Sequence, residues 1–218
     1  MIKVITFDVW NTLLKVELMF HKIEFFLSEI CGISESRVKE AFSLSRNKAK
    51  NLRYQGILPA KEAVNICQKI LADYLEIDVD LVKRATAKAV ISVGKEVVLP
   101  EVPETLKLLK ESGYKLACIG NVQFWPSAYT RIFMERYGIS QYLDKHIFSD
   151  EAGFFKPSPE IFHQAVAFFG VKPHEVLHVG DREKEDYQGA TRAGLKALLI
   201  NPSLSIKGQV LSALNLQN

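Results

Sequence analysis

Several features that mark special classes of protein are scarce or missing in this sequence of 218 residues. There are only three cysteines, Cys31, Cys67 and Cys118, and they lie far apart in apolar or helical surroundings. An odd number without close spacing favours neither a disulfide framework nor a thiolate metal site. We therefore expect three buried thiols.

Long apolar runs and an excess of one charge are missing as well. No uninterrupted apolar run is long enough to span a bilayer, and the chain opens on a strand-like segment rather than on a signal peptide. Its 28 basic and 25 acidic residues give a formal net charge of only +3, and the basic residues are scattered. This balance argues against an extended nucleic-acid or membrane footprint. We expect a cytoplasmic protein, monomeric or homodimeric, with no nucleic-acid or membrane partner.

The most informative stretch runs from Ile2 to Leu14; it is apolar up to Asp8 and then turns. A buried strand that ends on a carboxylate places that charge at the carboxyl end of a parallel sheet, where pockets lie. An Asp that merely starts a turn would give the same local pattern. On this stretch alone both interpretations stay open.

The rest of the chain divides into a helical part and an alternating part. After Leu14 the apolar residues recur with helical spacing until Gly32. Three more helices are expected at 34–54, 59–75 and 78–93. Beyond them short apolar strands alternate with helices, which is typical of βαβ units. The expected strands are 115–119, 146–148, 176–179 and 197–200, and the expected helices are 104–111, 127–137, 159–169 and 186–193.

These segments predict an α/β protein with a doubly wound, Rossmann-like parallel sheet. We expect a core domain made of residues 1–13 and 99–218, interrupted by an all-helical cap domain at residues 14–98. An insert of this size can hold a small core of its own. Because it follows the Asp8 turn directly, it would sit above the carboxyl ends of the strands and close over a bound molecule, excluding water.

Polar groups lie at the ends of further predicted strands or in the loops that follow them. Gly120 and Asn121 form a pair that brings backbone N–H groups close to a ligand or makes a turn. Lys156 precedes a proline-initiated helix, where it would balance a carboxylate and a phosphate or lie solvated on the surface. Asp181 and Asp186 offer the hard oxygen ligands that Mg²⁺ prefers. An acidic helix start would also explain Asp186, but it explains Asp181, directly after the strand, less well.

Taken together, the order and spacing of these residues resemble the four motifs of the haloacid dehalogenase (HAD) superfamily of hydrolases. The resemblance covers the whole predicted core, and the helical insert matches the commonest cap position of that family. The residues that carry it are, in chain order, Asp8 with Thr12-Leu13, Gly120-Asn121, Lys156-Pro157, and Gly180-Asp181 with Asp186.

The resemblance implies covalent catalysis, in which Asp8 attacks an electrophilic phosphorus or carbon and water then hydrolyses the ester. It assigns the other catalytic positions to Lys156, Gly120 and Asn121. The leading hypothesis is therefore a phosphatase of a small phosphorylated metabolite.

The same resemblance implies a magnesium site. In the family's phosphatases, Mg²⁺ is bound by the nucleophile, by the fourth-motif acid and by the backbone carbonyl two residues after the nucleophile. The corresponding groups here are Asp8, Asp181, Asp186 and the carbonyl of Trp10, which a change of side chain does not remove. We therefore expect Mg²⁺ as the cofactor.

Two departures from the family pattern weaken the expected catalysis. Family phosphatases carry a second Asp, the general acid and base, where this chain has Trp10, and a Ser or Thr where it has Gly120. A general acid or base typically contributes about 10²–10⁴ in rate, and one well-placed donor about 10²–10³. Substrates with good leaving groups should then be favoured. If no phosphoenzyme accumulates, His178 or a water held by Asn121 is expected to serve as the base.

Two alternatives stay open. Dehalogenases of the superfamily have an aromatic residue where Trp10 stands and use no metal, so a metal-independent 2-haloacid dehalogenase is the second candidate. Against it, the acidic residues from Asp181 to Asp186 would repel the carboxylate of a 2-haloacid. The third candidate is a binding or regulatory protein on a catalytically weakened scaffold, because two catalytic side chains are missing.

Binding residues for a small anionic substrate are expected from the basic run at 45–54 and from nearby aromatics. Arg46, Lys50 and Arg53 would share one helix face, although such a run is more often a solvated face. Trp125 follows the second motif, where pocket lining and core packing explain it equally well. The expected binding residues are Trp10, Thr12, Arg46, Arg53 and Trp125.

Overall fold

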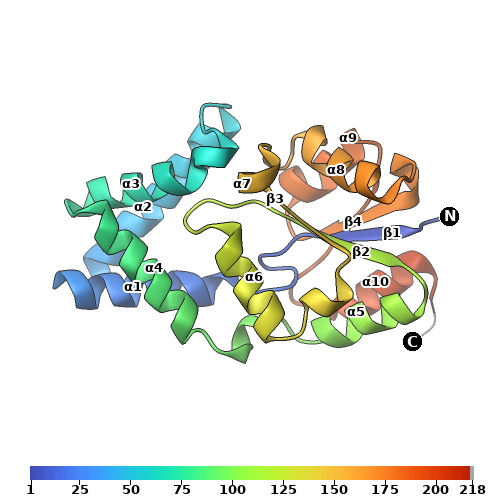
Figure 1. The fold of residues 1–218 in the computed structure, drawn as a ribbon, viewed down its shortest axis with the longest axis horizontal. Coiled ribbons are helices and arrows are strands. Elements are labelled where there is room, and N and C mark those ends of the chain that lie inside the picture. The colour runs from blue at the N-terminus through green and yellow to red at the C-terminus, as the bar shows by residue number, and fades with distance from the viewer. Residues whose placement is uncertain (217–218) are drawn as a thin grey trace.

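The computed structural model describes residues 1–216 and contains one five-stranded sheet in which all neighbouring strands are parallel. The strands are β1 (Val4–Phe7), β2 (Lys115–Gly120), β3 (Lys145–Phe148), β4 (Val176–Gly180) and β5 (Lys196–Leu199). Their spatial order is β3-β2-β1-β4-β5, so the chain winds outward to both sides of β1 (Figure 1). The predicted doubly wound α/β architecture is confirmed.

Helices cover both faces of this sheet (Figure 1). One face carries α8 (Pro159–Phe169) and α9 (Gln188–Arg192), and the other carries α5 (Val102–Glu111) and α10 (Ile206–Leu214). Two helices, α6 (Ser127–Arg136) and α7 (Ser149–Ala152), follow β2 and β3. Short 3₁₀ turns occupy Ala60–Glu62, Lys95–Val97, Ser140–Tyr142 and Pro173–Glu175.

β1 lies at the centre because its side chains can be buried on both faces, as in other parallel sheets covered by helices. Val4 belongs to the apolar cluster formed with α8 and α9, whereas Ile5 and Phe7 belong to the cluster on the other face. Phe7 pairs with Cys118 on β2 and with Val179 on β4. The three central strands therefore end close together, at the edge where the order of the sheet reverses.

The other four helices stand together beside the carboxyl ends of the strands (Figure 1). They are α1 (Val16–Cys31), α2 (Glu35–Tyr54), α3 (Ala63–Leu75) and α4 (Val79–Ser92). The chain enters and leaves this group through adjacent segments, because the Lys15 N–H donates to the Val97 carbonyl at 2.7 Å and the Leu99 N–H donates to the Leu13 carbonyl at 3.0 Å. The helical content of this part was predicted, and its division from the core as a separate domain stays a prediction.

The main local difference from expectation lies before α9. The helix expected at 186–193 begins instead with a π-helical turn, Glu183–Tyr187, in which the Tyr187 N–H reaches the carbonyl of Arg182 at 3.3 Å. The wider turn is consistent with the Asp186 carboxylate accepting a hydrogen bond from the Arg182 N–H at 3.0 Å. Two helices, α7 and α10, were not expected.

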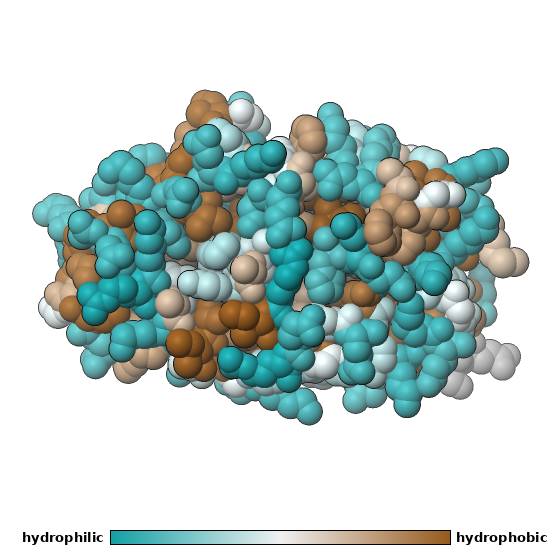
Figure 2. All heavy atoms as spheres, viewed as in Figure 1, coloured by the Kyte–Doolittle hydropathy of each residue, from teal (hydrophilic) through white to brown (hydrophobic). Residues whose placement is uncertain are grey.

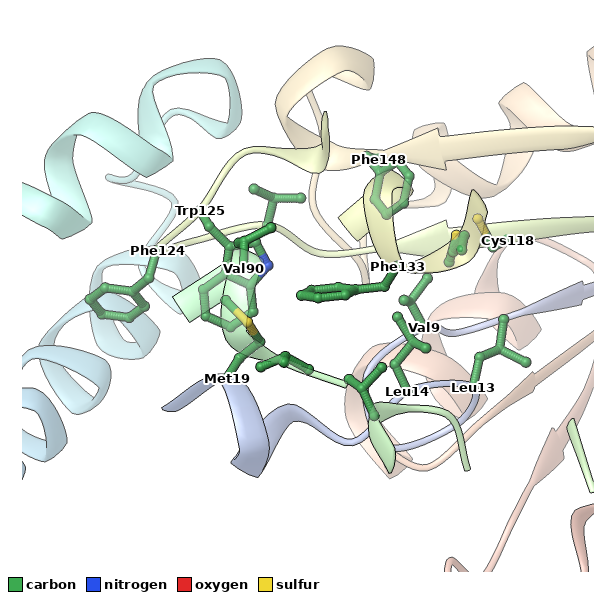
Figure 3. Close-up of a cluster of buried hydrophobic side chains, with 14 of the residues drawn as sticks. Val9, Leu13, Leu14, Met19, Val90, Cys118, Phe124, Trp125, Phe133 and Phe148 are labelled. Carbon is green, nitrogen blue, oxygen red and sulfur yellow. The ribbon is translucent and has the colours of Figure 1, made fainter. Parts of the chain in front are cut away.

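A single apolar cluster joins the helical group to the sheet. It contains Leu27 on α1, Phe42 on α2 and Val82 on α4 together with Leu106 on α5 and Phe133 on α6. Figure 3 shows its central part, where Met19 and Val90 from the helical group lie near Phe133 and Trp125. The helical group is therefore packed against the core and not merely tethered to it.

Hydrophilic side chains cover most of the face drawn in Figure 2, with apolar side chains in small groups between them. The most exposed large apolar residues include Ile57, Ile91 and Leu204. Among the described residues, no helix combines the length and the apolar character that a membrane span requires.

Candidate active site

Asp8 lies directly after β1 and faces a cavity of about 350 Å³. Its N–H still belongs to the sheet, because it donates to the Val179 carbonyl at 2.8 Å. Its side chain is almost fully buried, and the cavity is lined from the other side by α1 and α2. Of the two interpretations of the first motif, the structure supports a carboxylate at a pocket and not a surface turn.

Among residues 1–216, Lys156 is the only lysine with a buried side chain, and two carboxylates hold its ammonium group. Its Nζ donates to Asp8 Oδ1 and, at 2.7 Å, to Asp186 Oδ1. Asn121 fixes the backbone of Lys156, since its Oδ1 accepts from the Lys156 N–H at 2.8 Å and its Nδ2 donates to the Lys156 carbonyl at 3.0 Å. Asn121 therefore contacts the loop that carries Lys156.

Asp186 is the most heavily hydrogen-bonded of the acids at this site. Besides Lys156 it contacts His178 Nε2 at 3.2 Å and the Arg182 N–H at 3.0 Å. Burial alone would raise the pKa of Asp186, but the Lys156 ammonium and the His178 hydrogen bond outweigh it and hold that pKa well below its usual range. His178 is itself fully buried, which lowers its pKa, and its Nδ1 lies 2.9 Å from Thr6 Oγ1.

The charge balance at Asp8 is different. Burial raises the pKa of the Asp8 carboxyl, and the carboxylates of Asp186 and Asp181 raise it further, while the Lys156 ammonium opposes them. For Lys156, burial lowers the pKa, but the two carboxylates beside it raise it above the usual value. The ammonium is therefore retained, and it stabilises the ionised form of Asp8.

Three carboxylates at the site meet the requirements of a hard cation. Asp8, Asp181 and Asp186 each offer an oxygen within 4.8 Å of the others. Asp181 Oδ1 is buried without a hydrogen-bond partner, and among residues 1–216 the Trp10 carbonyl accepts no hydrogen bond. Oxygen donors with free lone pairs at this spacing fit a Mg²⁺ ion.

Three predicted site residues, Thr12, Gly120 and Asp181, do not line the cavity. Thr12 is fully buried in a tight turn, in which the N–H groups of Thr12, Leu13 and Leu14 all donate to the Val9 carbonyl. Gly120 is packed at the end of β2, where an added Cβ would lie 3.0 Å from the Phe148 ring and 3.1 Å from Val9 Cγ2. Substrate binding by Thr12 and a catalytic part for Gly120 therefore stay predictions that the lining of the cavity does not support. Crowding explains why position 120 carries no hydroxyl side chain.

Aromatic side chains form one wall of the cavity. Trp10 packs edge-to-face against Trp125, with ring centroids 5.2 Å apart, and Phe20 packs against Trp125 at 5.9 Å. The Arg46 guanidinium lies 4.3 Å from the centre of the Phe20 ring. All four residues line the cavity, and a part for Trp10, Trp125 and Arg46 in substrate binding stays a prediction.

Arg53 also lines the cavity, but it carries a contact that the sequence did not suggest. Its Nη2 donates to Glu185 Oε1 at 2.6 Å, and the Tyr54 hydroxyl donates to the same oxygen at 2.6 Å. The Arg53 and Glu185 side chains are only 9% and 5% exposed. This ion pair joins the end of α2 to the π-helical turn that follows β4. Nothing in the run of acids at 183–186 distinguishes Glu185 as the partner.

Two more lining residues, Asn11 and Glu17, were missed. The Asn11 backbone is left-handed (φ 65°), its Oδ1 accepts from the Val16 N–H at 3.2 Å, and its Nδ2 donates to Glu17 Oε1 at 3.3 Å. Asn tolerates this conformation better than most residues. Asn11 could have been noticed from the sequence, because it lies inside the first motif. Glu17 could not, because its spacing from that motif follows no periodic pattern.

Comparison with known proteins agrees with this geometry. The model of the haloacid dehalogenase-like hydrolase family matches residues 2–194, and this chain belongs to that family. Over 109 residues it is 38% identical to glyceraldehyde 3-phosphate phosphatase from Methanothermobacter thermautotrophicus, a match covering 49% of this chain and 46% of that protein. The chain thus spans less than half the length of this curated relative.

Solved structures share the fold over most of the chain. The HAD-hydrolase YfnB from Bacillus subtilis, which was crystallised with bound magnesium, superimposes with a TM-score of 0.79 over 99% of both chains at 18% identity. A HAD phosphatase from Thermococcus onnurineus does so with a TM-score of 0.64, at 26% identity, over 92% of this chain and 85% of that one. These likenesses extend across the helical group as well as the sheet.

Proposed function

We propose that this protein is a Mg²⁺-dependent hydrolase of small phosphate monoesters that works through an aspartyl-phosphate on Asp8. The observation that carries the proposal is the buried contact of Lys156 with both Asp8 and Asp186 at the edge of the cavity. The similarity to glyceraldehyde 3-phosphate phosphatase supports a small phosphorylated substrate. We also propose that residues 14–98 form the cap over this site.

Asp8 acts as the nucleophile in this proposal. Its carboxylate oxygen attacks phosphorus, the bond from phosphorus to the leaving oxygen breaks, and water later hydrolyses the acyl phosphate. The Lys156 ammonium offsets the charge of the carboxylates and of the entering phosphoryl group. Asn121 positions Lys156 by holding its backbone at both ends.

Mg²⁺ fits the oxygen donors of Asp8, Asp181 and Asp186 and the backbone carbonyl of Trp10. When bound, the ion would neutralise charge on the phosphoryl oxygens. Without a cation, three carboxylates would face an anionic substrate with one buried ammonium between them, and the repulsion would oppose binding.

The cavity suits a small anionic molecule. Its volume of about 350 Å³ lies in the range of small-molecule sites. Its cationic lining residues are Arg46, Lys50, Arg53, Lys156 and Arg182. Arg46 and Arg53 both belong to α2, which lines the cavity on the side opposite Asp8. They are therefore the proposed contacts for the part of the substrate away from the reacting phosphate. Trp10 and Trp125 are the proposed apolar contacts.

The test is phosphate release from aryl, acyl and alkyl phosphates, with Mg²⁺ and with a chelator. We expect activity that requires Mg²⁺ and that is lost in Asp8→Asn, because an amide is a very poor nucleophile. Asp73→Asn, which removes the same group from an exposed position on α3, is the matched control and should keep full activity. Equal activity with chelator, or none on any phosphate, would contradict the proposal.

A metal-independent 2-haloacid dehalogenase is the second candidate, and Trp10 favours it because its side chain lines the cavity where family phosphatases carry an acid. The assay is chloride release from 2-chloropropionate in the presence of chelator. Chloride release there, with no phosphatase activity, would replace the first proposal. If the protein is instead a binding or regulatory scaffold, neither activity is found and Asp8→Asn keeps the biological role.

A further inference from the structure

The cavity is lined by a limited set of side chains that could act as a general acid or base. Its lining carboxylates are Asp8, Glu17, Glu185 and Asp186, and no histidine, cysteine or tyrosine of the described residues lines it. Asp181, which lies beside Asp8 but does not line the cavity, is one of the proposed Mg²⁺ ligands. A hydrolase that lacks the usual acid at Trp10 would therefore take its acid and base from the lining carboxylates.

Three of these four carboxylates are committed to other contacts. Asp8 is the proposed nucleophile and is paired with Lys156. Asp186 accepts from Lys156, from His178 and from the Arg182 N–H. Glu185 accepts from both Arg53 and Tyr54 at 2.6 Å. Removing a proton from water would require each of them to give up a buried, charge-assisted bond.

The sequence suggested His178, or a water held by Asn121, as the base, and both side chains are already hydrogen-bonded elsewhere. His178 is fully buried, is hydrogen-bonded through both ring nitrogens to Thr6 and Asp186, and does not line the cavity. Asn121 uses both ends of its amide on the backbone of Lys156. His178 is therefore not placed to accept a proton from a water molecule beside the substrate, and both polar ends of the Asn121 amide are already occupied.

Glu17 differs from all of these groups. It is an exposed residue in the first turn of α1, and its hydrogen bond in the structure comes from Asn11 Nδ2 at 3.3 Å, near the long limit for such a bond. Asn11 directly follows Trp10, and its own Oδ1 holds the Val16 N–H. Glu17 is therefore tied to the segment that carries Asp8, while its carboxylate keeps access to solvent.

Resting on the proposed hydrolase function, we propose that Glu17 carries out the proton transfers for which Trp10 has no group. Asp8 attacks phosphorus, the bond to the leaving oxygen breaks, and the protonated Glu17 carboxyl gives its proton to that oxygen. The resulting Glu17 carboxylate then takes a proton from water. The water oxygen attacks phosphorus, the bond to Asp8 breaks, and inorganic phosphate, free Asp8 and protonated Glu17 are regenerated.

A purely structural role for Glu17 makes a different prediction. An acid in the first turn of a helix interacts favourably with the positive end of the helix dipole. Its removal would then lower stability slightly and would change the rates for all substrates alike. Proton donation, in contrast, matters most when the leaving oxygen is strongly basic, so it affects alkyl phosphates more than nitrophenyl phosphate.

The experiment measures kcat/KM of Glu17→Gln with Mg²⁺ on ethyl phosphate and on 4-nitrophenyl phosphate. We expect a loss of about 10²–10⁴ on ethyl phosphate and a much smaller loss on 4-nitrophenyl phosphate. With the latter, a burst of nitrophenol is expected because breakdown of the phosphoenzyme loses its base. Glu29→Gln removes the same charge from an exposed position near the other end of α1 and should match the wild type.

Glu17→Asp keeps a carboxyl group and should recover part of the activity on ethyl phosphate. This variant keeps the proposal testable if Glu17→Gln folds poorly. Equal losses on both substrates, or none, would overturn the role of Glu17 while leaving the proposed function intact. A wild-type protein inactive on every phosphate would overturn the proposed function, and this inference with it.

Discussion

Gly120 lies at the end of β2 without room for a side chain, and this gives a prediction at the scale of one residue. Gly120→Ala should lower the free energy of unfolding by about 1–3 kcal/mol, the usual effect of forcing extra atoms into a packed site, because its Cβ would press on Phe148 and Val9. Urea denaturation measures this difference.

The matched control for that substitution is Gly208→Ala in α10. An added Cβ there meets only Ser205, at 3.5 Å or more, so the higher helix propensity of alanine should raise stability by about 0.5–1 kcal/mol. Wild-type stability in Gly120→Ala would contradict the crowding argument, and would leave the missing hydroxyl at this position without a physical reason.

Gly120 also illustrates why only part of the site could be predicted from the sequence. Asp8, Lys156 and Asp186 could be predicted, because each stands at a strand end or in the loop after it and their chemistry is unusual there. Thr12 and Gly120 could not be placed, because whether such a residue faces the cavity depends on the packing of Val9 and Phe148, which lie on different strands or turns.

At the scale of elements, Asp144 joins α5 to the start of β2. It accepts from Lys110 Nζ at 2.8 Å and from the Leu116 N–H at 2.8 Å. Burial opposes ionisation, but these bonds outweigh it and lower the pKa of Asp144. A lowered pKa in the folded state means that the stabilisation is present above the unfolded pKa of about 3.9, and is lost as pH falls through the folded value.

We therefore expect Asp144→Asn to lose about 1–2 kcal/mol of unfolding free energy at pH 7. The difference from wild type should shrink toward zero near pH 2–3, where the wild-type carboxyl is protonated too. Asp73→Asn, in an exposed pair with Lys69, serves as control and should change stability by less than about 0.5 kcal/mol. A difference for Asp144→Asn that does not change with pH would refute the electrostatic origin of the effect.

Elements themselves were predictable to different degrees. Apolar periodicity predicted the long helices and the buried strands, because a helix face or a strand interior is repeated along the sequence. The π turn at Glu183–Tyr187 was not predictable, since it depends on the Asp186 carboxylate reaching back to the Arg182 N–H in the folded chain. This deviation from regular helix geometry lies at the candidate site, where sequence rules are expected to fail most often.

At the scale of the whole molecule, the helical group and the sheet share one apolar cluster. Phe42 on α2 packs edge-to-face against Phe124 in the loop after β2, with ring centroids 5.0 Å apart, and both side chains are buried. The buried Arg53–Glu185 pair joins the same two parts of the molecule. Movement of the helical group away from the sheet would expose the Phe42–Phe124 contact and the Arg53–Glu185 pair. The site can therefore open only slightly unless both contacts break.

The shared cluster predicts that the molecule unfolds in one step. The only two tryptophans, Trp10 and Trp125, both line the cavity between the two parts, so their fluorescence reports on that boundary. We expect the urea transitions followed by tryptophan fluorescence and by far-ultraviolet circular dichroism to coincide.

Phe42→Ala should weaken that coupling. Loss of the buried ring is expected to lower stability by about 3–5 kcal/mol, and to shift the fluorescence transition to lower urea than the dichroism transition, because the boundary opens first. Phe168→Ala, at an exposed position on α8, should leave both transitions in place. Two separate transitions in the wild-type protein would mean that the apolar cluster does not couple the helical group to the core, and that the helical group can open without unfolding the sheet.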